Sequence, residues 1–573
     1  MSFSLINTGE RRHLTLQKGM NDRWPKSIES GADRIYVCKT HEEVANAANE
    51  ALNNNYRITV RSGGHCYEGF VSNKLSEAKL AIIDLGEMKG FNYNPGYLTN
   101  DESTMIQSIY DLDNFVNNKA NYNFAIFTGN QNWDSYVSLY KTIGKTLPGG
   151  SCYSVGVGGH FSGGGYGLLS RLHGCVVDHV TGIDILVPDG ANKVLIGKHV
   201  RSNSLSATDR DLFTACLGAG GGNFGIIIRY YFDQLPDAPQ EAYWTTLSWN
   251  WSDFNTKESF SKFLEAYYNW FYINDKDSNS DLIYLNNGGL FSLLKLNHEK
   301  IGGKIVLAVQ YTNGVTGRVG THDEDLAFDD FISTMINASG IAPTHYEGYV
   351  YPNITPIKRG LHGKIWEKKN IIKDNWLTIT MLINGSGPTL RGKYKSSYQR
   401  SQFTKVASEG LYDCLRSNGT IGRDLPTGVS ECVFQIDSYG GNINSRGIAN
   451  TSVAQRNSLL KTQYQIYWRD ETDPSGSLDT ACEEWIKSAY DLIHADTGGR
   501  PTPGILDNYG NEIYQGCYIN YPDIDMLESA TGLPDSNWLK LYYYDDNLID
   551  RLKNLKIEVD PNNIFHHQMS IPI

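Results

Sequence analysis

The hydrophobic and polar positions near the N-terminus predict a strand, a helix and a second strand in succession. Residues 34–38 form an apolar, β-branched run that favours a strand, and residues 56–60 form another. Between them, Thr40 and Glu43 have the spacing of a capping box, in which each side chain satisfies a free amide of the other residue. Apolar residues then recur at helical spacing, namely Val44, Ala47, Ala48 and Leu52. This β-α-β start indicates an α/β domain.

The next part of the chain alternates between polar and glycine-dense sequence. Residues 86–121 are polar, and we expect them to form an excursion from the domain. Residues 124–127 are apolar and predict a strand that ends beside a glycine. Glycines then cluster in residues 149–167 and again in residues 218–225, which indicates two long loops.

The middle of the chain, from about residue 235 to residue 510, predicts a second domain. It contains strand-like runs, for example residues 377–381 and 433–436, and amphipathic helices such as residues 480–494. Successive strands of this kind favour an antiparallel sheet. The last segment, residues 518–573, is rich in aromatic residues. There is no internal repeat.

Composition restricts the class of protein. The chain has 573 residues, a net charge of −12, 40% hydrophobic and 20% charged residues, which is ordinary for a globular protein. It contains no apolar run long enough to span a membrane and no secretory signal, so a cytoplasmic location is the default expectation. The negative charge disfavours a nucleic-acid partner. The nine cysteines are irregularly spaced without a CxxC pair, so neither a disulfide framework nor a zinc site is expected.

The aromatic content is unusual, with 36 tyrosines and 11 tryptophans. Aromatic faces pack against the apolar faces of sugars and polyketides, while the OH and NH groups give directional hydrogen bonds. Filling of the core and of sheet faces explains most individual aromatic residues equally well. The aromatic residues therefore suit a sugar or polyketide ligand without requiring one.

The second glycine cluster matches a dinucleotide-binding motif in letters but not in context. Gly220–Gly225 reads G-x-G-x-x-G, a motif that should leave a strand and open a helix. Here the β-branched and aromatic residues 226–232 follow, which predict a strand. We therefore reject NAD binding in a Rossmann fold. The exposed amides could still cradle a pyrophosphate, although one such cluster is equally consistent with a bulge or turn.

Two further loops carry candidate chemistry. Residues 61–70 place His65 after two glycines, where the backbone can come close to another group. A metal site, a nucleophile, a phosphate site and an attached cofactor are all compatible with this position. Ten glycines fall within residues 149–174, together with Cys152 and His160. That density is entropically costly, so we expect a loop wrapped around a large polar ligand. No metal-ligand spacing, HExxH motif or G-x-S-x-G elbow is present, so neither a metal site nor an α/β-hydrolase is expected.

Taken together, these motifs resemble the FAD-linked oxidases of the vanillyl-alcohol oxidase and berberine-bridge-enzyme type. Residues 61–65 look like the family loop whose histidine bonds the flavin 8α-methyl, and residues 150–160 like the loop whose cysteine bonds flavin C6. Residues 220–225 resemble the family's cofactor loop, and residues 560–571 its closing DPNNxF…QSI signature. The resemblance runs from about residue 36 to residue 573.

Within the family, the motifs look closest to hexose oxidase and to bacterial tailoring oxidases acting on glycosides. The motifs that indicate this are residues 64–68, 147–153, 384–388, 391–395 and 516–523. The chain departs from the family pattern in the polar insertion around residues 93–122, in Ala219 and in Met569. The insertion could reshape the edge of the cofactor domain, while the two single-residue departures put little in doubt.

The resemblance implies an α+β fold with a PCMH-type FAD-binding domain of two α/β subdomains and a substrate domain whose antiparallel sheet is covered by helices. The implied boundaries are 1–235 for the FAD-binding part, 236–510 for the substrate domain and 511–573 for a segment that returns to the FAD domain. It also implies bicovalent FAD, attached through His65 and Cys152, rather than an orienting histidine and a buried thiol. The implied cofactor-binding residues are Arg61, Ser62, Gly63, Gly64, Tyr67, Gly129, Gly149, Gly150, Val155, Gly156, Gly158, Gly159, His160, Gly163, Gly222, Asn223, Gly225, Ile227 and Asn563.

The resemblance also implies a catalytic base. Tyr521 matches the family position, and because a tyrosine has a pKa near about 10, it needs nearby positive charge or hydrogen-bond donors to reach the phenolate. Tyr439 is the predicted partner that polarises Tyr521 or holds the substrate, with a packing role as the alternative. Tyr518 is expected to be structural. Arg391, Lys393 and Lys395 are expected to solvate a strand edge rather than supply positive potential to the site.

Three functional hypotheses follow from the resemblance. The first is a carbohydrate oxidase that converts an anomeric alcohol to a lactone, with oxygen as second substrate and hydrogen peroxide as product; the small Val155 goes with oxygen access in relatives. The second is a tailoring oxidase that acts on the sugar or hydroxyl of a natural product. The third is a flavoprotein used for binding or storage that has lost catalysis. A Tyr521→Phe substitution distinguishes this case, because a non-catalytic protein would lose no activity.

Overall fold

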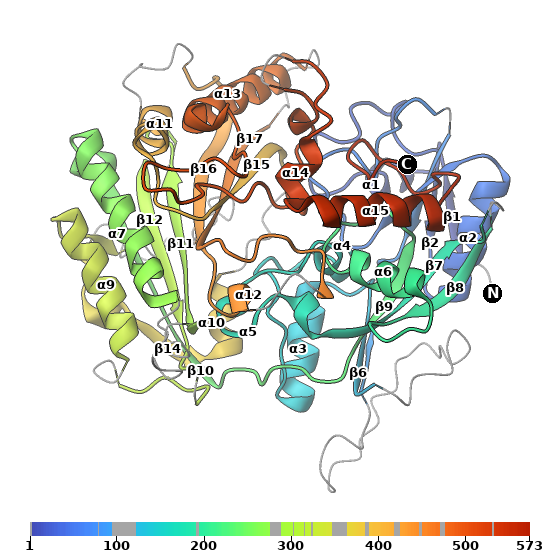
Figure 1. The fold of residues 1–573 in the computed structure, drawn as a ribbon, viewed down its shortest axis with the longest axis horizontal. Helices are drawn as coiled ribbons and strands as arrows, with labels where there is room; N and C mark the ends of the chain where they lie inside the picture. The colour runs from blue at the N-terminus through green and yellow to red at the C-terminus, as the bar shows by residue number, and fades with distance from the viewer. Residues whose placement is uncertain are drawn as a thin grey trace, which may run out of the picture.

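Three β-sheets and the helices between them make up the computed structural model of the protein (Figure 1). The structure describes residues 3–573 except 78, 94–121, 191–193, 276–287, 302, 315, 322–324, 346–363, 384–388, 417–423, 446–449, 470–475 and 530–531. The predicted excursion and the motif at residues 384–388 therefore lie largely or wholly outside the described residues. The mixture of helices with parallel and antiparallel strands is the expected α+β fold.

The first sheet contains the predicted β-α-β start. Its strand order is β1 (Ser4–Asn7), β2 (Arg34–Val37), β4 (Leu80–Asp84) and β3 (Arg57–Arg61), with β2 and β3 parallel to β4. Helix α2 (His41–Asn53) connects β2 to β3. Thr40 Oγ1 accepts the Glu43 amide at 3.3 Å as predicted, but the Glu43 carboxylate accepts the Lys39 amide instead of closing the capping box.

The second sheet is antiparallel and has the order β5 (Phe91–Tyr93), β6 (Phe124–Phe127), β9 (Ile226–Phe232), β7 (Val180–Pro188) and β8 (Leu195–Val200). The predicted strands at residues 124–127 and 226–232 are confirmed. Because β9 follows Gly225 directly, the G-x-G-x-x-G motif leads into a strand, as the sequence indicated. The α-helices between β6 and β9 along the chain are α3 (Asn132–Ile143), α4 (Val157–Ser162), α5 (Ser170–His173) and α6 (Ala207–Cys216). Of these, α4 packs against β9 and α6 packs against β8, whereas α5 contacts β11 of the third sheet.

The third sheet is the large antiparallel sheet predicted for the middle of the chain. Its order is β13 (Thr344–His345), β10 (Glu241–Asn250), β12 (Lys304–Tyr311), β11 (Leu290–Asn297), β16 (Val429–Ser438), β17 (Leu460–Trp468) and β15 (Arg391–Gln399), with β14 (Ile372–Asn375) also paired to β10. All of its strand pairs are antiparallel. Residues 433–436 lie in β16, as predicted.

One predicted strand is wrong. Residues 377–381 form part of helix α10 (Trp376–Leu382), although their alternation of apolar and threonine residues is typical of a strand. The Asn375 side chain caps this helix by accepting the Thr378 amide at 2.9 Å. The helix also buries Trp376 and Ile379. Capping and burial therefore outweigh the β-propensity of this short run.

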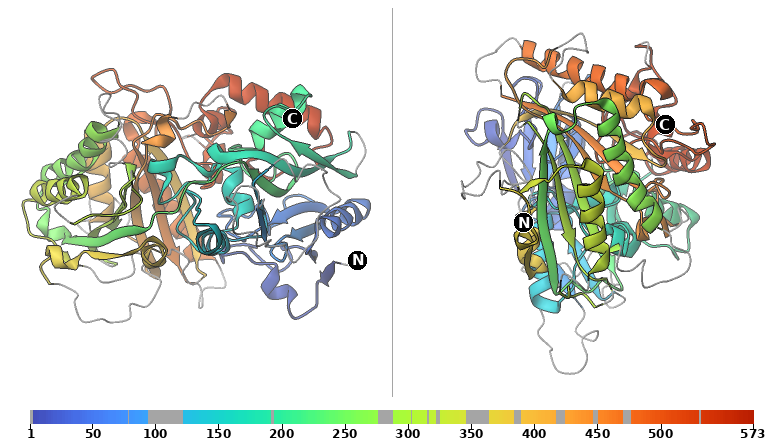
Figure 2. Two further views of the ribbon diagram at one scale, coloured as in Figure 1. Left: turned by 90° about the horizontal axis from the view of Figure 1, so that it is seen from below. Right: turned by 90° about the vertical axis from the view of Figure 1, so that its left-hand side faces the viewer.

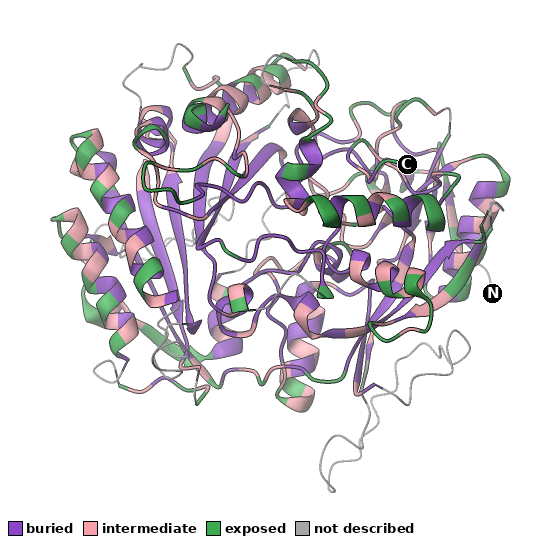
Figure 3. Ribbon diagram, in the orientation of Figure 1, coloured by how far each residue is buried: buried purple, intermediate pink, exposed green. Residues whose placement is uncertain are grey.

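Four helices cover one face of the large sheet, while its other face is turned toward the two smaller sheets (Figures 1 and 2). They are α7 (Lys257–Asp275), α9 (Leu326–Ser339), α11 (Lys405–Leu415) and α13 (Ser477–Ile493), and α13 confirms the helix predicted near residues 480–494. Apart from the exposed β14, the strands of this sheet are mostly buried, whereas the helices expose their outer sides (Figure 3).

The C-terminal segment crosses back to the smaller sheets (Figure 1). Helices α14 (Trp538–Tyr543) and α15 (Asp546–Val559) lie there, and α15 packs against α6. The remaining short helices are α1 (His13–Leu16), α12 (Asn442–Ser445), η3 (Val176–His179), η4 (Trp251–Asp253), η5 (Lys368–Asn370), η7 (Ala495–Thr497) and η8 (Ile524–Leu527). In the described part of the chain, no helix has both the length and the apolar character of a membrane span.

Candidate active site

A cavity of about 410 Å³ lies where the three glycine-rich loops meet the large sheet. Most predicted cofactor residues line it, together with His65, Cys152 and Tyr521. Those that line it are Arg61, Ser62, Gly63, Gly64, Tyr67, Gly150, Val155, Gly156, Gly158, Gly159, His160, Gly222, Asn223, Gly225 and Ile227. Five predicted site residues are not among those lining the cavity, namely Gly129, Gly149, Gly163, Tyr439 and Asn563.

The first two loops touch each other through their backbones. A Cβ atom added to Gly63 would lie 2.2 Å from the Gly156 amide nitrogen, and one added to Gly156 would lie 2.1 Å from the Gly63 nitrogen. Gly167 is equally confined, because its Cβ would lie 1.7 Å from the Gly149 carbonyl oxygen. Gly63 and Gly156 are therefore required by packing between the two loops, and Gly167 by packing within the second loop, whereas the sequence predicts that the glycines wrap around a ligand.

His65 lies in the first loop as a neutral imidazole. Burial lowers its pKa to about 4, so it carries no charge at neutral pH. Its Nε2 shares a 2.8 Å hydrogen bond with Ser154 Oγ of the second loop. The other ring nitrogen, Nδ1, has no hydrogen bond to the described residues. The contact with Ser154 holds the ring in place at the wall of the cavity, which His65 lines.

The loop that carries Cys152 is held by three hydrogen bonds to Gly150. Its carbonyl accepts from Tyr136 Oη at 2.8 Å and from Asn132 Nδ2 at 3.2 Å, and its amide donates to His160 Nε2 at 2.9 Å. Burial lowers the pKa of His160 to about 3, which keeps it a hydrogen-bond acceptor. Cys152 is partly exposed and forms no disulfide bond with the described cysteines. His160 therefore orients the loop from the side of the cavity.

The third loop is attached to the C-terminal signature by a buried lysine that sequence reasoning missed. Lys556 Nζ donates to the Asn223 carbonyl at 2.7 Å, to the Phe565 carbonyl at 2.6 Å and to Asp560 Oδ2 at 2.7 Å. The Asn223 side chain in turn accepts the Ile571 amide at 2.9 Å. The i, i+4 spacing of Lys556 and Asp560 at the end of α15 was the available signal.

The large sheet presents a mostly polar surface to the cavity. Alternate residues of a strand face the same side, and the register of β16 and β17 sets such residues opposite one another. The cavity is lined by the opposite pairs Asp437 and Lys461, Gln435 and Gln463, Val433 and Gln465, and Glu431 and Tyr467. Hydrogen bonds continue along this row, since Gln465 donates to Gln463 at 3.0 Å and Gln463 donates to the Tyr67 hydroxyl at 2.9 Å.

Tyr521 faces a buried lysine at one end of this row. Lys461 Nζ lies 3.3 Å from the Tyr521 hydroxyl and 3.1 Å from Asp437 Oδ2. Burial raises the pKa of Tyr521 and of Asp437 and lowers that of Lys461. An ammonium so close to the phenol acts against the burial effect on Tyr521, because it stabilises the phenolate.

The predicted partner of Tyr521 is not beside it. Tyr439 is 1% exposed and donates its hydroxyl to the Gln455 carbonyl at 3.0 Å, away from the cavity. The structure instead brings Lys461 to Tyr521, because its strand position opposite Asp437 points it inward. Tyr518 is buried and accepts from Asn520 Nδ2 at 3.0 Å.

The expectation that Lys393 and Lys395 are solvated at a strand edge is wrong. Their side chains are 2% and 0% exposed and form ion pairs with carboxylates. Arg391, on the same strand, is partly exposed and pairs with Asp479. The edge strand β15 is covered by other segments of the chain, so its charged residues are buried.

Comparison with known proteins places the chain among flavin-dependent oxidases. Residues 32–194 match the FAD binding domain family, and residues 517–572 match the berberine and berberine-like family. Hexose oxidase of Chondrus crispus is 31% identical over 97% of this chain and 93% of its own length. Aclacinomycin-N/aclacinomycin-A oxidase of Streptomyces galilaeus is 29% identical over 99% and 89%. A glycopeptide hexose oxidase crystallised with teicoplanin superposes with a TM-score of 0.76 at 26% identity, over 100% of this chain and 99% of its own.

The interlocked glycines predict a sharp difference between two alanine variants. Gly63→Ala should destabilise the protein by about 4 kcal/mol or more, because backbone atoms cannot yield to the added methyl. Gly159→Ala should fold like the wild type, since no heavy atom lies within 4 Å of its added Cβ. Thermal unfolding followed by circular dichroism measures both. Equal stability of the two variants would contradict the interlocking of the loops.

The Lys556 contacts predict a second stability effect. Lys556→Met removes the cation from buried Asp560 and should cost about 3–5 kcal/mol. It should also release the third loop, so the fraction of purified protein that carries flavin should fall. Lys553→Met on the same helix is the matched control, because Lys553 is partly exposed. A Lys556→Met protein with wild-type unfolding temperature and flavin content would show that this lysine does not hold the loop.

Proposed function

The chain belongs to the FAD-linked oxidases of the berberine-bridge-enzyme type, and from that premise we propose that it oxidises a sugar hydroxyl, with FAD attached covalently through His65 and Cys152. The family membership makes it an FAD-dependent oxidase that uses a small-molecule substrate and oxygen. The proposal adds the sugar, the conversion of its anomeric alcohol to a lactone, and the two attachment residues. Its supporting observations are the contacts of the cavity.

The residues at the cavity fit FAD. His65 is neutral and keeps Nδ1 available, as a covalent bond to the flavin requires. Cys152 is a partly exposed thiol in the facing loop, whereas the cysteines that lie away from the cavity are buried. The backbone at Gly159 opens onto free space, which leaves room for close approach of a large ligand. The glycine loops therefore supply both attachment points and exposed amides on one side of the cavity.

Bound FAD would supply the acceptor for the hydride and pass the electrons to oxygen, giving hydrogen peroxide. The protein supplies the base. Tyr521, as the phenolate, would take the proton from the substrate hydroxyl, and Lys461 would stabilise that phenolate at 3.3 Å. Asp437 holds the lysine in place through its 3.1 Å ion pair. The small apolar side chain of Val155 lines the cavity and is the proposed oxygen-access position.

The row of polar residues on the large sheet is the observation that favours a sugar as the substrate. Gln435, Gln463 and Gln465 lie side by side with Glu431 and the Asp437–Lys461 pair in the cavity. Amide and carboxylate groups in such a row can donate to and accept from several neighbouring hydroxyls, whereas an apolar substrate would leave their remaining donors and acceptors, such as Gln435 Oε1, unsatisfied. A ligand with many hydroxyl groups, such as a hexose, fits this surface best.

A tailoring oxidase is the second candidate, and one observation favours it. Tyr67 stacks on Tyr394 with ring centroids 3.7 Å apart and an interplanar angle of 9°, and both residues line the cavity. Such a pair offers a flat apolar face for an aromatic aglycone. In that case the sugar would reach the polar row while still joined to a natural product.

The sugar proposal predicts reduction of the flavin by free sugars. Anaerobic mixing of the purified protein with glucose, galactose, lactose and cellobiose should bleach the flavin absorbance near about 450 nm with at least one of them. Admission of air should restore the colour and produce hydrogen peroxide. Tyr521→Phe should keep the bound flavin but lose the bleaching. A protein that dithionite reduces and no sugar bleaches would overturn the free-sugar function in favour of the tailoring function.

The pairing of Lys461 with Tyr521 predicts a change in pH dependence. Lys461→Met removes the ammonium that stabilises the phenolate, so the pKa of Tyr521 should rise by about 1–3 units. The rate of flavin reduction should therefore reach its half-maximum at a correspondingly higher pH. Lys461→Arg retains the charge and should shift the profile less. An unchanged pH profile in Lys461→Met would show that another group sets the ionisation of the base.

A further inference from the structure

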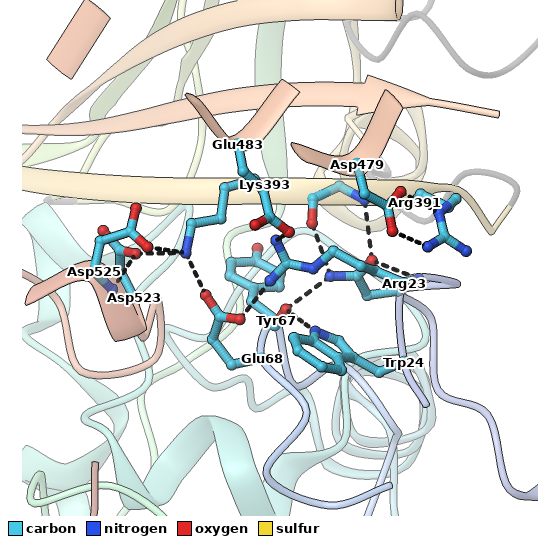
Figure 4. Close-up of polar contacts among 12 residues, drawn as sticks. Arg23, Trp24, Tyr67, Glu68, Arg391, Lys393, Asp479, Glu483, Asp523 and Asp525 are labelled. Carbon is cyan, nitrogen blue, oxygen red and sulfur yellow. Dashed lines mark hydrogen bonds and ion pairs between the residues drawn. The ribbon is translucent and has the colours of Figure 1, made fainter. Parts of the chain in front are cut away.

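A buried ion cluster joins two of the segments that line the cavity (Figure 4). Lys393 extends from β15 and places Nζ 2.8 Å from Glu68 Oε1, 2.7 Å from Asp523 Oδ1 and 3.1 Å from Asp525 Oδ1. The side chains of Lys393, Glu68 and Asp523 are at most 2% exposed. Burial alone would lower the pKa of Lys393, but Asp523, Asp525 and Glu68 raise it, so the side chain remains an ammonium.

The two segments are the ones that matter for the proposed reaction. Glu68 follows His65 in the first glycine loop, and Asp523 follows Tyr521 in the segment that carries the base. One ammonium therefore contacts both the loop of the proposed flavin attachment and the segment of the proposed base. Two carboxylates that would otherwise repel each other are held on either side of one cation.

Each half of the cluster also has a cation of its own. Arg23 pairs with Glu68, and the backbone carbonyl of Tyr67 accepts from Trp24 Nε1 at 3.2 Å (Figure 4). On the other side, Lys395 pairs with Asp523 at 2.7 Å. Without Lys393, each carboxylate would thus keep one partner. What would be lost is the ionic connection between the two halves, whereas the ring contact between Tyr67 and Tyr521 would remain.

The energetics favour a geometric role for this connection. Taking several charges out of water costs free energy that their mutual attraction only partly repays, so buried ion pairs contribute little net stability. A cation bound to three carboxylates does, however, fix where those carboxylates lie. Hydride transfer is sensitive to such placement, since a displacement of about 1 Å remote from the reacting atoms can cost about 100-fold in rate.

We propose that Lys393 is a positioning residue that sets the separation between the His65 loop and the Tyr521 segment through Glu68 on one side and Asp523 on the other. This inference rests on the proposed function, because the separation matters only if His65 attaches the flavin and Tyr521 acts on the substrate. Lys393 itself does not line the cavity.

The test compares Lys393→Met with Arg391→Met in the full chain. Both remove a cation from the same strand, but Arg391 pairs with Asp479 and reaches neither Glu68 nor Asp523. Lys393→Met should fold and show a lower fraction of chains with flavin bonded at His65, measured by mass spectrometry of the denatured protein. Its rate of flavin reduction by substrate should fall about 100-fold while the half-saturating concentration stays unchanged. Arg391→Met should match the wild type in all three measurements.

A double variant separates positioning from charge balance. Glu68→Gln combined with Lys393→Met removes one anion with one cation, so it should regain the stability lost in the single variant but not its attachment or rate. Recovery of all three in the double variant would overturn the positioning role, as would wild-type attachment and rate in Lys393→Met.

If the proposed function is wrong, the measurements differ from those expected if only the role of Lys393 is wrong. A wild-type protein with flavin on His65 that no sugar reduces would contradict the sugar substrate, and the attachment measurement would still test Lys393. If the wild type holds FAD without a bond to His65, the attachment proposal is wrong. The visible circular dichroism of the flavin then reports the geometry, and it should change in Lys393→Met and not in Arg391→Met; no change in Lys393→Met would overturn the positioning role.

Discussion

The site depends on a contact between two backbones at Gly63 and Gly156, where neither residue has room for a side chain. This contact brings the loop after β3 against the loop before α4, and the hydrogen bond between His65 and Ser154 also joins the two loops. Loops this rich in glycine lose much conformational entropy when they fold, so they need external support. Part of that support comes from segments far away in the chain, such as the closing residues of the protein, which return to the two smaller sheets and hold the third loop.

Three buried lysines provide part of this support, and they share one arrangement. Lys556, Lys461 and Lys393 each pair with at least one carboxylate and direct a remaining donor at a segment of the site. The carboxylate offsets the cost of burying the ammonium, and the other contact places the segment. In a medium of low dielectric these contacts are strong and directional, so a few of them can order loops that have little side-chain packing.

The local sequence pattern was sufficient to predict a helix or strand when the residues that determine it lie within that helix or strand or directly beside it. Helix α2 has its cap and its apolar face in adjacent residues, β6 is a short apolar run, and β9 is a β-branched and aromatic run interrupted only by Arg229, so all three could be predicted. Helix α10 was missed because its capping contact at Asn375 competes with a β-like alternation. The glycine loops and Tyr521 were found through long family motifs. Lys461 was not, because it is brought to Tyr521 by the pairing of β17 with β16, which local periodicity does not reveal.

The edge strand β15 shows how one strand can serve both halves of the molecule. Tyr394 faces the cavity, where it stacks on Tyr67, while the neighbouring Lys393 and Lys395 face away and enter the ion cluster. Successive side chains of a strand point to opposite faces of the sheet, so residue 394 faces the cavity while residues 393 and 395 face the other side. An edge strand with free hydrogen-bonding groups is normally a liability. Here the Asn21 side chain bonds the backbone of Gly392, and residues 515–516 bond the backbone of Tyr398. The substrate sheet is thereby joined to the cofactor loops at the strand where the tyrosine stack and the ion cluster meet.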